Sequence, residues 1–412
     1  MRQLLRLFMV CYLFGQRVAA PIRRCRPPAS EGYDVLVTGT FHSANWALAH
    51  LRPLAMSEKC ARVLVVSVLS VPQINKVEVI RPPAWLVKCL GAVPARMVTF
   101  AFVGLRERPH FIGGFHLLFN GLVAALVAPL AGARSIYFCV GGPMEIIGGG
   151  LWGNPLFARI GKPDSVIENQ MIEAIKRFDI IITMGTRAVQ EFSSRGIDGV
   201  FHVVPGGIDT KKFFPSSGHL SIDIILVARF DPIKRIDIFL RAVSLARKSL
   251  PELKVVIVGD GPLRIEIEAL CHELELESFV TLVGQQSNVE VWLRKARLFA
   301  LTSDSEGLAL ALMEAMQCGL PAVVSNVGDL ADLVEDGVNG FLVSDRTPQE
   351  FAQRFVDVLC DPLRWQRFRA AAHASMSQYE LPCAVQHWNR ILGSFDTPRV
   401  MVPLETLPGK NL

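Results

Sequence analysis

The chain has 412 residues, which is too many for one ordinary hydrophobic core, so we expect two domains. Half of the residues are apolar, and the formal charge is only +5. Proteins that bind nucleic acid usually carry dense basic clusters, and only residues 17–26 form one here, so this class is excluded. The composition favours contact with an anionic membrane surface or with small anionic substrates.

The first 31 residues fit three interpretations. Two arginines, Arg2 and Arg6, precede an apolar run over 7–15 and small residues at 18–20, as in a short signal peptide. This run is too short to span a bilayer. The other two interpretations are an amphipathic segment on a membrane surface and a disordered lead-in. They are favoured because the rest of the chain looks intracellular.

Nine cysteines are present, with no CxxC pair and no His-rich spacing. Most of them lie in apolar runs, which is typical of small core residues in a reducing compartment. We therefore expect a cytoplasmic protein. A peripheral position at the inner face of the membrane is a further hypothesis.

From residue 34 onward, strand-like and helix-like runs alternate at the spacing of βα units, which predicts parallel sheets with helices on both faces. A cluster of Gly, Pro and Ser over 205–220 interrupts this alternation, and the pattern then starts afresh. The predicted fold class is α/β, with two doubly wound domains. The predicted parts are a lead-in over 1–31, a Rossmann-like domain over 32–204, a linker over 205–220, a second Rossmann-like domain over 221–380, and over 381–412 a helix that returns to the first domain, followed by a tail.

Residues 79–105 mix long apolar stretches with basic side chains and a proline. Charges inside the stretch argue against a transmembrane helix. An interfacial amphipathic segment fits the mixture, and so does a buried helix and strand of the first domain. The sequence leaves both interpretations open.

Two glutamates, Glu306 and Glu314, stand eight positions apart behind a strand-like run over 297–302. The first lies at a strand-to-helix turn and the second about two turns into an apolar helix. Ligands of such sheets bind outside the carboxyl ends of the strands. Carboxylates accept hydrogen bonds from vicinal hydroxyls, and the free N–H groups of Gly307, Leu308 and Ala309 would favour an anionic group. The pattern indicates a nucleotide sugar.

Two cations, Arg229 and Lys234, follow the first strand of the second domain. Fixed cations can stabilise a departing diphosphate electrostatically, so no metal is needed. Alone, the segment would be interpreted as a solvated turn with surface charges. Its position near the two glutamates favours the interpretation that both cations point into the crevice between the domains. Asp304 and Glu306 superficially resemble an Asp-x-Asp metal clamp. Because Glu306 already has a role and cations are present, we expect no metal and no other cofactor.

Three further features are weaker. Gly259 and Gly261 form a Gly-x-Gly turn that lacks the third glycine of a dinucleotide loop. Gly39 marks the mouth of the first sheet, and it is the only hint of a dehydrogenase. His116 lies in an apolar run, where a lone histidine is usually a core residue.

Four ordered motifs make the chain similar to glycosyltransferase family 4, whose members are retaining enzymes with the GT-B fold. The resemblance is close over 205–345 and loose over 33–204. The motifs are Glu306-x7-Glu314, Arg229-x4-Lys234, the turn over 258–262, and the linker-like stretch over 205–215, with a further similar stretch over 327–340 that closes the donor site in this family.

The resemblance implies a role for each matched residue. Glu314 would bind the ribose hydroxyls, and Glu306 would contact the donor sugar or face the reaction centre. The backbone of 307–309 would contact sugar and phosphate, while Arg229 and Lys234 would hold the diphosphate.

In the first domain, the resemblance matches His116 to a histidine that lies near the sugar. The chain also departs from the family, with Gly206 in place of Asn, Asp329 in place of Gly, and Gly39 alone in place of a Gly-Gly turn. The stretch 141–145 has an unusual form and is expected to shape the acceptor side.

The expected activity is transfer of a sugar from a nucleoside diphosphate to an acceptor hydroxyl with retention of configuration. The expected acceptor is a glycan or a lipid-linked glycan, as in polysaccharide or glycolipid assembly. The alternatives are a nucleotide-sugar epimerase of the same fold, a dehydrogenase and a non-catalytic nucleotide-sugar-binding protein.

Overall fold

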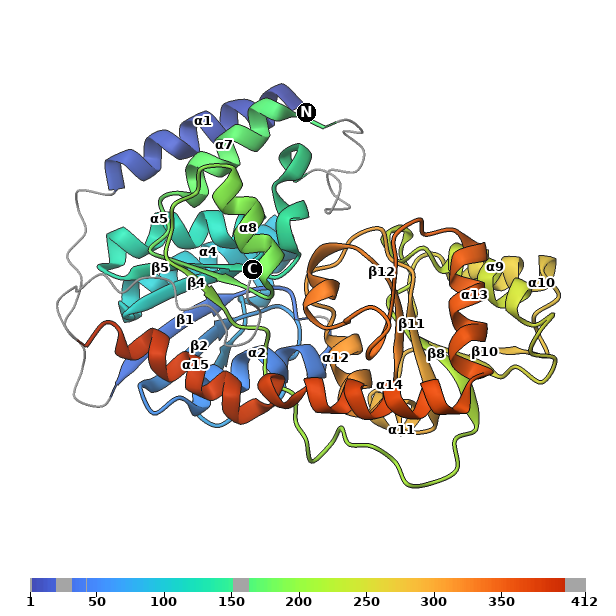
Figure 1. The fold of residues 1–412 in the computed structure, drawn as a ribbon. Helices are drawn as coiled ribbons and strands as arrows, with labels where there is room; N and C mark the ends of the chain where they lie inside the picture. The colour runs from blue at the N-terminus through green and yellow to red at the C-terminus, as the bar shows by residue number, and fades with distance from the viewer. Residues whose placement is uncertain (1, 20–31, 42, 151–162, 397–412) are drawn as a thin grey trace.

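The computed structural model describes residues 2–19, 32–41, 43–150 and 163–396. Two parallel sheets lie side by side, each with helices on both faces (Figure 1). We call residues 2–203 the N-terminal half and residues 222–375 the C-terminal half.

The N-terminal sheet contains seven strands in the order β3-β2-β1-β4-β5-β6-β7, and every neighbouring pair is parallel. The strand order reverses between β1 and β4, which creates a crevice at the carboxyl ends of these two strands. The strands are rich in Val, Ile and Phe because both faces are covered. Their bounds are Tyr33–Thr38 (β1), Cys60–Val66 (β2), Val77–Ile80 (β3), Phe111–Phe115 (β4), Arg134–Cys139 (β5), Ile180–Thr183 (β6) and Phe201–Val203 (β7).

Helices cover this sheet in two layers. One face packs against α4 and α5, and the other packs against α2 and the C-terminal helix α15, which contacts α2 directly. The bounds are Arg2–Ala19 (α1), Ala44–Met56 (α2), Ala84–Leu90 (α3), Ala92–Glu107 (α4), Leu122–Ala131 (α5), Ser165–Ile175 (α7), Thr186–Ser194 (α8) and Leu381–Gly393 (α15), with short helices at Leu117–Gly121 (η2), Gly142–Glu145 (η3) and Ile147–Gly149 (η4).

The C-terminal sheet contains six parallel strands in the order β10-β9-β8-β11-β12-β13. Its order reverses between β8 and β11, so a second crevice opens where these strands end. The bounds are Ile222–Val227 (β8), Val255–Val258 (β9), Val280–Leu282 (β10), Ala296–Leu301 (β11), Ala322–Ser325 (β12) and Gly340–Val343 (β13).

The helices of the C-terminal half complete the same arrangement, and α14 leads into α15, which crosses back to the N-terminal sheet (Figure 1). The bounds are Ile236–Ala246 (α9), Arg264–Glu273 (α10), Val289–Leu293 (α11), Leu310–Gln317 (α12), Pro348–Leu359 (α13) and Pro362–Ser375 (α14), with short helices at Pro232–Lys234 (η5), Gly328–Asp332 (η6) and Ser377–Tyr379 (η7).

Helix α1 corrects the prediction of a disordered lead-in, at least for residues 2–19. It packs on α7 and α5 and buries Met9 and Tyr12. The Arg6 guanidinium lies 2.9 Å from the Asp164 carboxylate at the start of α7. Disorder was one of the interpretations that the sequence left open; the amphipathic interpretation agrees with the exposed apolar side chains of α1, and its membrane contact stays a prediction. Residues 20–31 lie outside the described residues.

Residues 79–105 contain the helix and strand of the first domain that one interpretation offered, and the interfacial interpretation stays a prediction. They contain the end of β3, all of α3 and most of α4. Helix α4 buries Phe100 and Val103 against the sheet, whereas its outer side is exposed and α3 buries no residue.

Within the described ranges, no helix is long and apolar enough to cross a membrane. Eight of the nine cysteines belong to these ranges, and all eight are free thiols.

Candidate active site

The centre of the candidate site is an ion pair between two loops that leave neighbouring strands. Lys234 follows β8 and Glu306 follows β11, the two strands that flank the reversal of strand order. The Lys234 Nζ atom lies 2.7 Å from the Glu306 Oε1 atom, which also accepts a hydrogen bond of 2.5 Å from the Ser303 hydroxyl. Both side chains are largely shielded from solvent. The sequence placed both residues in this crevice, and the fold brings them into direct contact.

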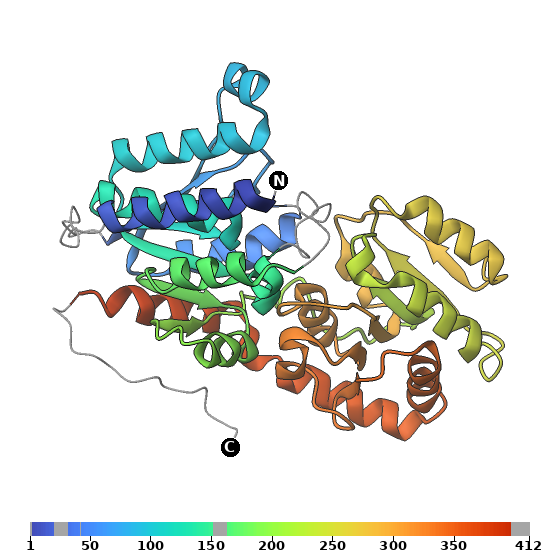
Figure 2. The same ribbon diagram turned by 90° about the horizontal axis from the view of Figure 1, so that it is seen from above.

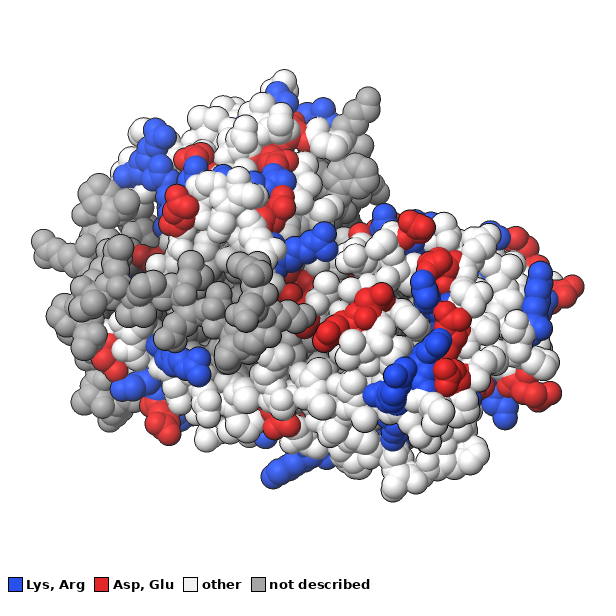
Figure 3. Space-filling model, viewed as in Figure 1, with Lys and Arg blue, Asp and Glu red and all other residues white. Residues whose placement is uncertain are grey.

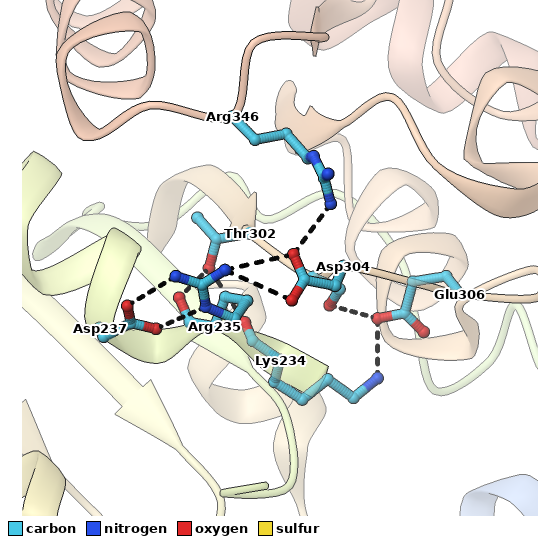
Figure 4. Close-up of polar contacts among 8 residues, drawn as sticks. Lys234, Arg235, Asp237, Thr302, Asp304, Glu306 and Arg346 are labelled. Atoms are coloured by element: carbon cyan, nitrogen blue, oxygen red, sulfur yellow. Dashed lines mark hydrogen bonds and ion pairs between the residues drawn. The ribbon is translucent and has the colours of Figure 1, made fainter. Parts of the chain in front are cut away.

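A layer of polar contacts holds Lys234 in place (Figure 4). The Thr302 hydroxyl donates to the carbonyl oxygens of Lys234 and Arg235, at 3.1 and 2.9 Å. Arg235 has a positive φ of 47° and donates through two nitrogens to Asp237, at 3.0 and 2.9 Å. Hydrogen bonds to Asp237, together with the charges of Asp237 and Asp304, raise the pKa of Arg235. The turn that presents Lys234 is therefore fixed from both sides.

Asp304 belongs to this layer of polar contacts. Its carboxylate accepts hydrogen bonds from Arg235 and from Arg346, the latter at 2.8 Å. Across the described ranges, no group of three or more His, Cys, Asp or Glu side chains is arranged to hold a metal ion. The lack of a metal stays a prediction.

The backbone behind Glu306 approaches the other half of the molecule. A Cβ atom on Gly307 would lie 2.3 Å from the carbonyl oxygen of Val140 at the end of β5, and one on Gly142 would lie 3.3 Å from the Glu306 carbonyl oxygen. Gly328 packs still more closely, because a Cβ atom there would lie 1.8 Å from the Glu306 carbonyl oxygen. The loop that carries Glu306 is therefore wedged between the end of β5 and η6.

The N–H groups of Gly307, Leu308 and Ala309 precede α12 at this same position. Among the described residues, no backbone or side-chain acceptor takes a hydrogen bond from them. Unpaired N–H groups before a helix favour a negatively charged ligand group. The structure thus provides the donors that the sequence predicted, directly beside Glu306.

Arg229 lies in the loop after β8, half-exposed, and its guanidinium contacts Asp231 with an Nε–Oδ2 distance of 2.7 Å. Arg229 is thus bonded to Asp231 and not to Lys234 or Glu306. Gly259 and Gly261 have a packing role here, because Cβ atoms on them would lie 1.8 Å from the Ala228 carbonyl oxygen and 2.5 Å from the Phe230 carbonyl oxygen. They allow the loop after β9 to close onto the loop that carries Arg229.

On the N-terminal side, His116 follows β4 and is held by a buried carboxylate. The His116 Nδ1 atom lies 3.0 Å from the Glu145 Oε1 atom. Glu145 also accepts from Leu117 N–H at 2.8 Å, Gly141 N–H at 2.6 Å and the Tyr137 hydroxyl at 2.8 Å. His116 has a φ of 66°, a strained backbone that costs on the order of 1–3 kcal/mol and is typical of functional sites.

His116 and Glu145 each stabilise the charged form of the other side chain. Desolvation disfavours the charged imidazole, but the charge and hydrogen bond of Glu145 outweigh it and raise the pKa of His116. Desolvation likewise opposes the carboxylate, but His116 and two backbone N–H groups lower the pKa of Glu145. Since an ionised carboxylate only accepts hydrogen bonds, Nδ1 carries a proton and Nε2 is left for a ligand.

Gly39 follows β1, the other strand at the N-terminal reversal. Its carbonyl oxygen accepts a 2.8 Å hydrogen bond from the buried Arg96, which also donates to Thr40 and Asn120. Desolvation lowers the pKa of Arg96. Arg96 therefore ties the loop after β1 to the segment after β4, and Gly39 packs on Phe115, the residue before His116.

Two aspartates of η6 join the halves. Asp332 accepts hydrogen bonds from the N–H and the hydroxyl of Thr186 at the start of α8, at 2.6 and 2.7 Å, and Asp329 accepts from Ala188 N–H at 3.2 Å. Burial, and then the charge of Asp332, raise the pKa of Asp329 to about 6. The sequence noted Asp329 as a departure from the family, and the structure shows that it caps a helix of the opposite half.

Glu314 occupies a separate pocket beside the linker. Burial raises the pKa of Glu314 to about 8, although the Lys212 charge and a hydrogen bond from Asn45 act in the opposite direction. Lys212 donates to the Asn45 side-chain oxygen at 2.9 Å. The pocket contains residues from α2, the linker and α12: Asn45, Leu48, Ala49, Arg52, Gly207, Ile208, Asp209, Lys212, Phe213, Leu310 and Glu314.

Sequence reasoning missed Glu145, Thr302 and Asp332 as site residues. Glu145 stands 29 positions from His116, and Asp332 stands 146 positions from Thr186, so no local spacing indicates either contact. The unusual stretch 141–145 was noted, and Thr302 at the end of β11 was within reach of the strand-end rule.

The two Rossmann-like sheets, which meet through the loops at their carboxyl ends, define the GT-B fold. Solved structures of that fold are similar to this chain. Anabaena Alr3699/HepE, solved with UDP and glucose, has a TM-score of 0.67 at 20% identity and covers 88% of this chain and all of its own. Sucrose-phosphate synthase from Thermosynechococcus elongatus has a TM-score of 0.72 at 17% identity and covers 88% and 98%.

Sequence comparisons point to the C-terminal half. Residues 209–375 match the family model for glycosyl transferases group 1. A D-inositol 3-phosphate glycosyltransferase of Mycolicibacterium vanbaalenii is 32% identical over 241 residues, 51% of this chain and 52% of the relative. Its Mycobacterium tuberculosis counterpart is 29% identical over 264 residues, 57% and 53% of the two chains. The chain thus spans about half the length of the curated relatives it matches.

Proposed function

We propose that the protein is a retaining glycosyltransferase of the family 4 type, which moves a sugar from a nucleoside diphosphate to an acceptor hydroxyl. The observation that carries this proposal is the pairing of Lys234 with Glu306 at one strand reversal and of His116 with Glu145 at the other, with the backbone at Gly307 packed closely on the end of β5. The group 1 family match over 209–375 supports it.

In the proposed reaction, the bond between the sugar C1 atom and the β-phosphate oxygen breaks, and a bond from C1 to the acceptor oxygen forms on the same face. The acceptor proton passes to the departing phosphate oxygen, so no base from the protein is required. Lys234 and the N–H groups of residues 307–309 would stabilise the negative charge of the diphosphate. His116 would donate through Nε2 to a sugar hydroxyl, while Glu306 would contact the donor sugar.

The remaining donor contacts come from flanking residues. Glu314 would accept hydrogen bonds from ribose hydroxyls, and Arg229 would add a cation for the diphosphate. The first donor to test is UDP-glucose, because the Anabaena neighbour was solved with UDP and glucose. Neither a metal nor another cofactor is part of the proposal.

We further propose a glycan or lipid-linked acceptor and a peripheral position at the cytoplasmic face of a membrane. The exposed apolar side chains of α1, α3 and α4 support this position. Since the curated relatives are named D-inositol 3-phosphate glycosyltransferases, inositol 3-phosphate is the first soluble acceptor to test.

The test begins with thermal shift against UDP-, GDP- and ADP-glucose, followed by turnover assays with and without acceptor. We expect transfer with the anomeric configuration kept, as seen by NMR of the product. Lys234→Ala should lower the turnover number roughly 100-fold or more, because it removes a preorganised charge. Lys248→Ala, an exposed lysine on the surface, is the matched control.

Three outcomes would count against the proposal. Epimerisation of the donor without an acceptor would identify the isomerase alternative. Tight donor binding without any turnover would identify a binding protein. Wild-type turnover by Lys234→Ala would show that the positive charge of Lys234 does not contribute to the reaction.

A further inference from the structure

The described exposed apolar side chains concentrate on four helices of the N-terminal half. Of the 21 large hydrophobic residues that are exposed, thirteen lie on α1, α3, α4 and α5. Contiguous exposed apolar surface of this kind marks an interaction site. We call the outer side of α1, α3 and α4 the apolar face.

Helix α1 contributes its whole outer side. Its inner residues pack on α5 and α7, while its outer side chains reach solvent exposures of 70% at Leu4 and 68% at Phe14. A surface helix normally exposes its polar residues and buries its apolar ones. The outer side of α1 is instead apolar, which is unfavourable in water. The exposed apolar residues of α1 are Leu4, Leu7, Phe8, Val10, Phe14 and Val18.

Helices α3 and α4 extend the same surface. Helix α3 is an apolar helix with no buried residue, and Trp85 is 67% exposed on it. In α4, Val98, Phe102 and Leu105 recur at helical spacing on the side away from the sheet. Figure 2 shows α1 and α4 running along one side of the N-terminal half, with α3 projecting beyond the end of α4.

The helices share one face of the sheet. Helix α5 packs on β4 and β5 and contacts both α1 and α4, so it lies between them. Their buried sides point toward the sheet, and their exposed sides therefore point away from it in a common direction.

The charged side chains of the apolar face are mostly basic. Helices α1, α3 and α4 contain a single carboxylate, Glu107, which bonds to Arg62. Against it stand exposed basic side chains, among them Arg17, Lys88 and Arg106. By contrast, basic and acidic side chains mix over the C-terminal half in Figure 3.

We infer that the apolar face docks into the interface of an anionic bilayer, with the apolar side chains among the acyl chains and the basic ones at the lipid phosphates. Apolar surface with a basic rim and an exposed Trp is the pattern of interfacial membrane binding. A symmetric contact between two copies would bring these like charges together, which disfavours a dimer at this face.

The experiment is flotation of the full chain with vesicles of phosphatidylcholine and phosphatidylglycerol, and with phosphatidylcholine alone. We expect co-flotation mainly with the anionic vesicles. Leu7→Gln with Phe14→Gln, and Trp85→Gln with Phe102→Gln, should each lower the bound fraction roughly tenfold or more, because they remove large apolar side chains from the bilayer.

The matched control is Ile265→Gln with Leu363→Gln, two side chains that are 78% and 74% exposed on the C-terminal half. This control should float like the wild type. Circular dichroism and size-exclusion chromatography show whether each variant is folded, and Lys88→Glu tests the charge without removing apolar surface.

Three results would overturn the inference. They are a wild-type protein that floats with neither vesicle, apolar-face variants that float like the wild type, and a wild-type dimer that these variants convert to a monomer. The inference extends the proposed peripheral position but does not depend on sugar transfer. Flotation needs no donor, so failure of one proposal leaves the other standing.

Discussion

The close approach at Gly307 offers a direct test of whether the two halves work together. A Cβ atom at this position would lie 2.3 Å from the Val140 carbonyl oxygen. Gly307 does not have the positive φ that an alanine would resist, so Gly307→Ala adds a methyl group without local backbone strain. Its effect should therefore fall on the distance between the loop after β11 and the end of β5.

The size of the effect follows from that distance. Ordinary contacts of this kind are about 3.4 Å, so the two chain segments must separate by roughly 1 Å. A misplacement of about 1 Å between groups that act together can cost on the order of 100-fold in rate. We expect Gly307→Ala to lower kcat/KM by about this factor, while each half keeps its own core.

The assay is sugar transfer at several donor concentrations, with thermal unfolding measured in parallel. Gly393→Ala is the matched control, because a Cβ atom there meets nothing closer than 3.9 Å. If Gly307→Ala retained wild-type kcat/KM, the contact between the halves would not position reacting groups. A large drop in melting temperature without a change in rate would give Gly307 a purely structural role.

Three further predictions concern charged groups. Glu145→Gln removes the anion beside His116, so the pKa of His116 should fall, and NMR titration of the ring would contradict this if it showed no shift. Burial raises the pKa of Glu314 to about 8. Because ribose hydroxyls would donate hydrogen bonds to the ionised carboxylate, the Kd for the donor should fall as pH rises toward about 8, by at most about tenfold per pH unit. Glu314→Gln should flatten this pH dependence. Asp332→Ala removes the cap on Thr186, worth about 1 kcal/mol, and should loosen the contact between the halves, which small-angle scattering would detect as a larger radius of gyration, and raise KM.

The centre of the candidate site was predictable because it follows from strand ends. Lys234 and Glu306 each stand a few residues behind a strand, and parallel strands bring their carboxyl ends to one edge. Local sequence therefore determined which loops would meet. It did not determine that the two side chains would bond to each other, since that depends on β8 and β11 being neighbours.

The contacts between the halves were not predictable in the same way. Asp329 and Asp332 bind the start of α8 through pairs more than 140 positions apart. Such contacts arise only after both sheets have formed and packed. The sequence showed Asp329 as an unusual residue, but the partner that explains it belongs to a different half.

Helix α1 shows a third limit. An amphipathic pattern predicts a helix whose apolar side is buried, but α1 exposes most of its large apolar side chains. One of its sides packs on α5 and α7, and the other remains exposed. A pattern that would normally indicate complete burial here reflects two surfaces, one for the protein and one for the proposed bilayer.

The charges of the site bear on how a donor would enter. Lys234 is neutralised by Glu306, and Arg235 is shared by Asp237 and Asp304. Arg229 is likewise paired with Asp231, so each of these three cations has an anionic partner, and the N–H groups of residues 307–309 are the donors left for a diphosphate. For Lys234 to bind the phosphates, Glu306 must turn away from it, and the donor sugar would offer hydroxyls as new partners for that carboxylate.

On this reasoning, a nucleoside diphosphate without its sugar leaves Glu306 unpaired and should bind more weakly than the complete donor. Calorimetry with UDP and UDP-glucose would measure the difference, and equal affinities would show that Glu306 does not change partners.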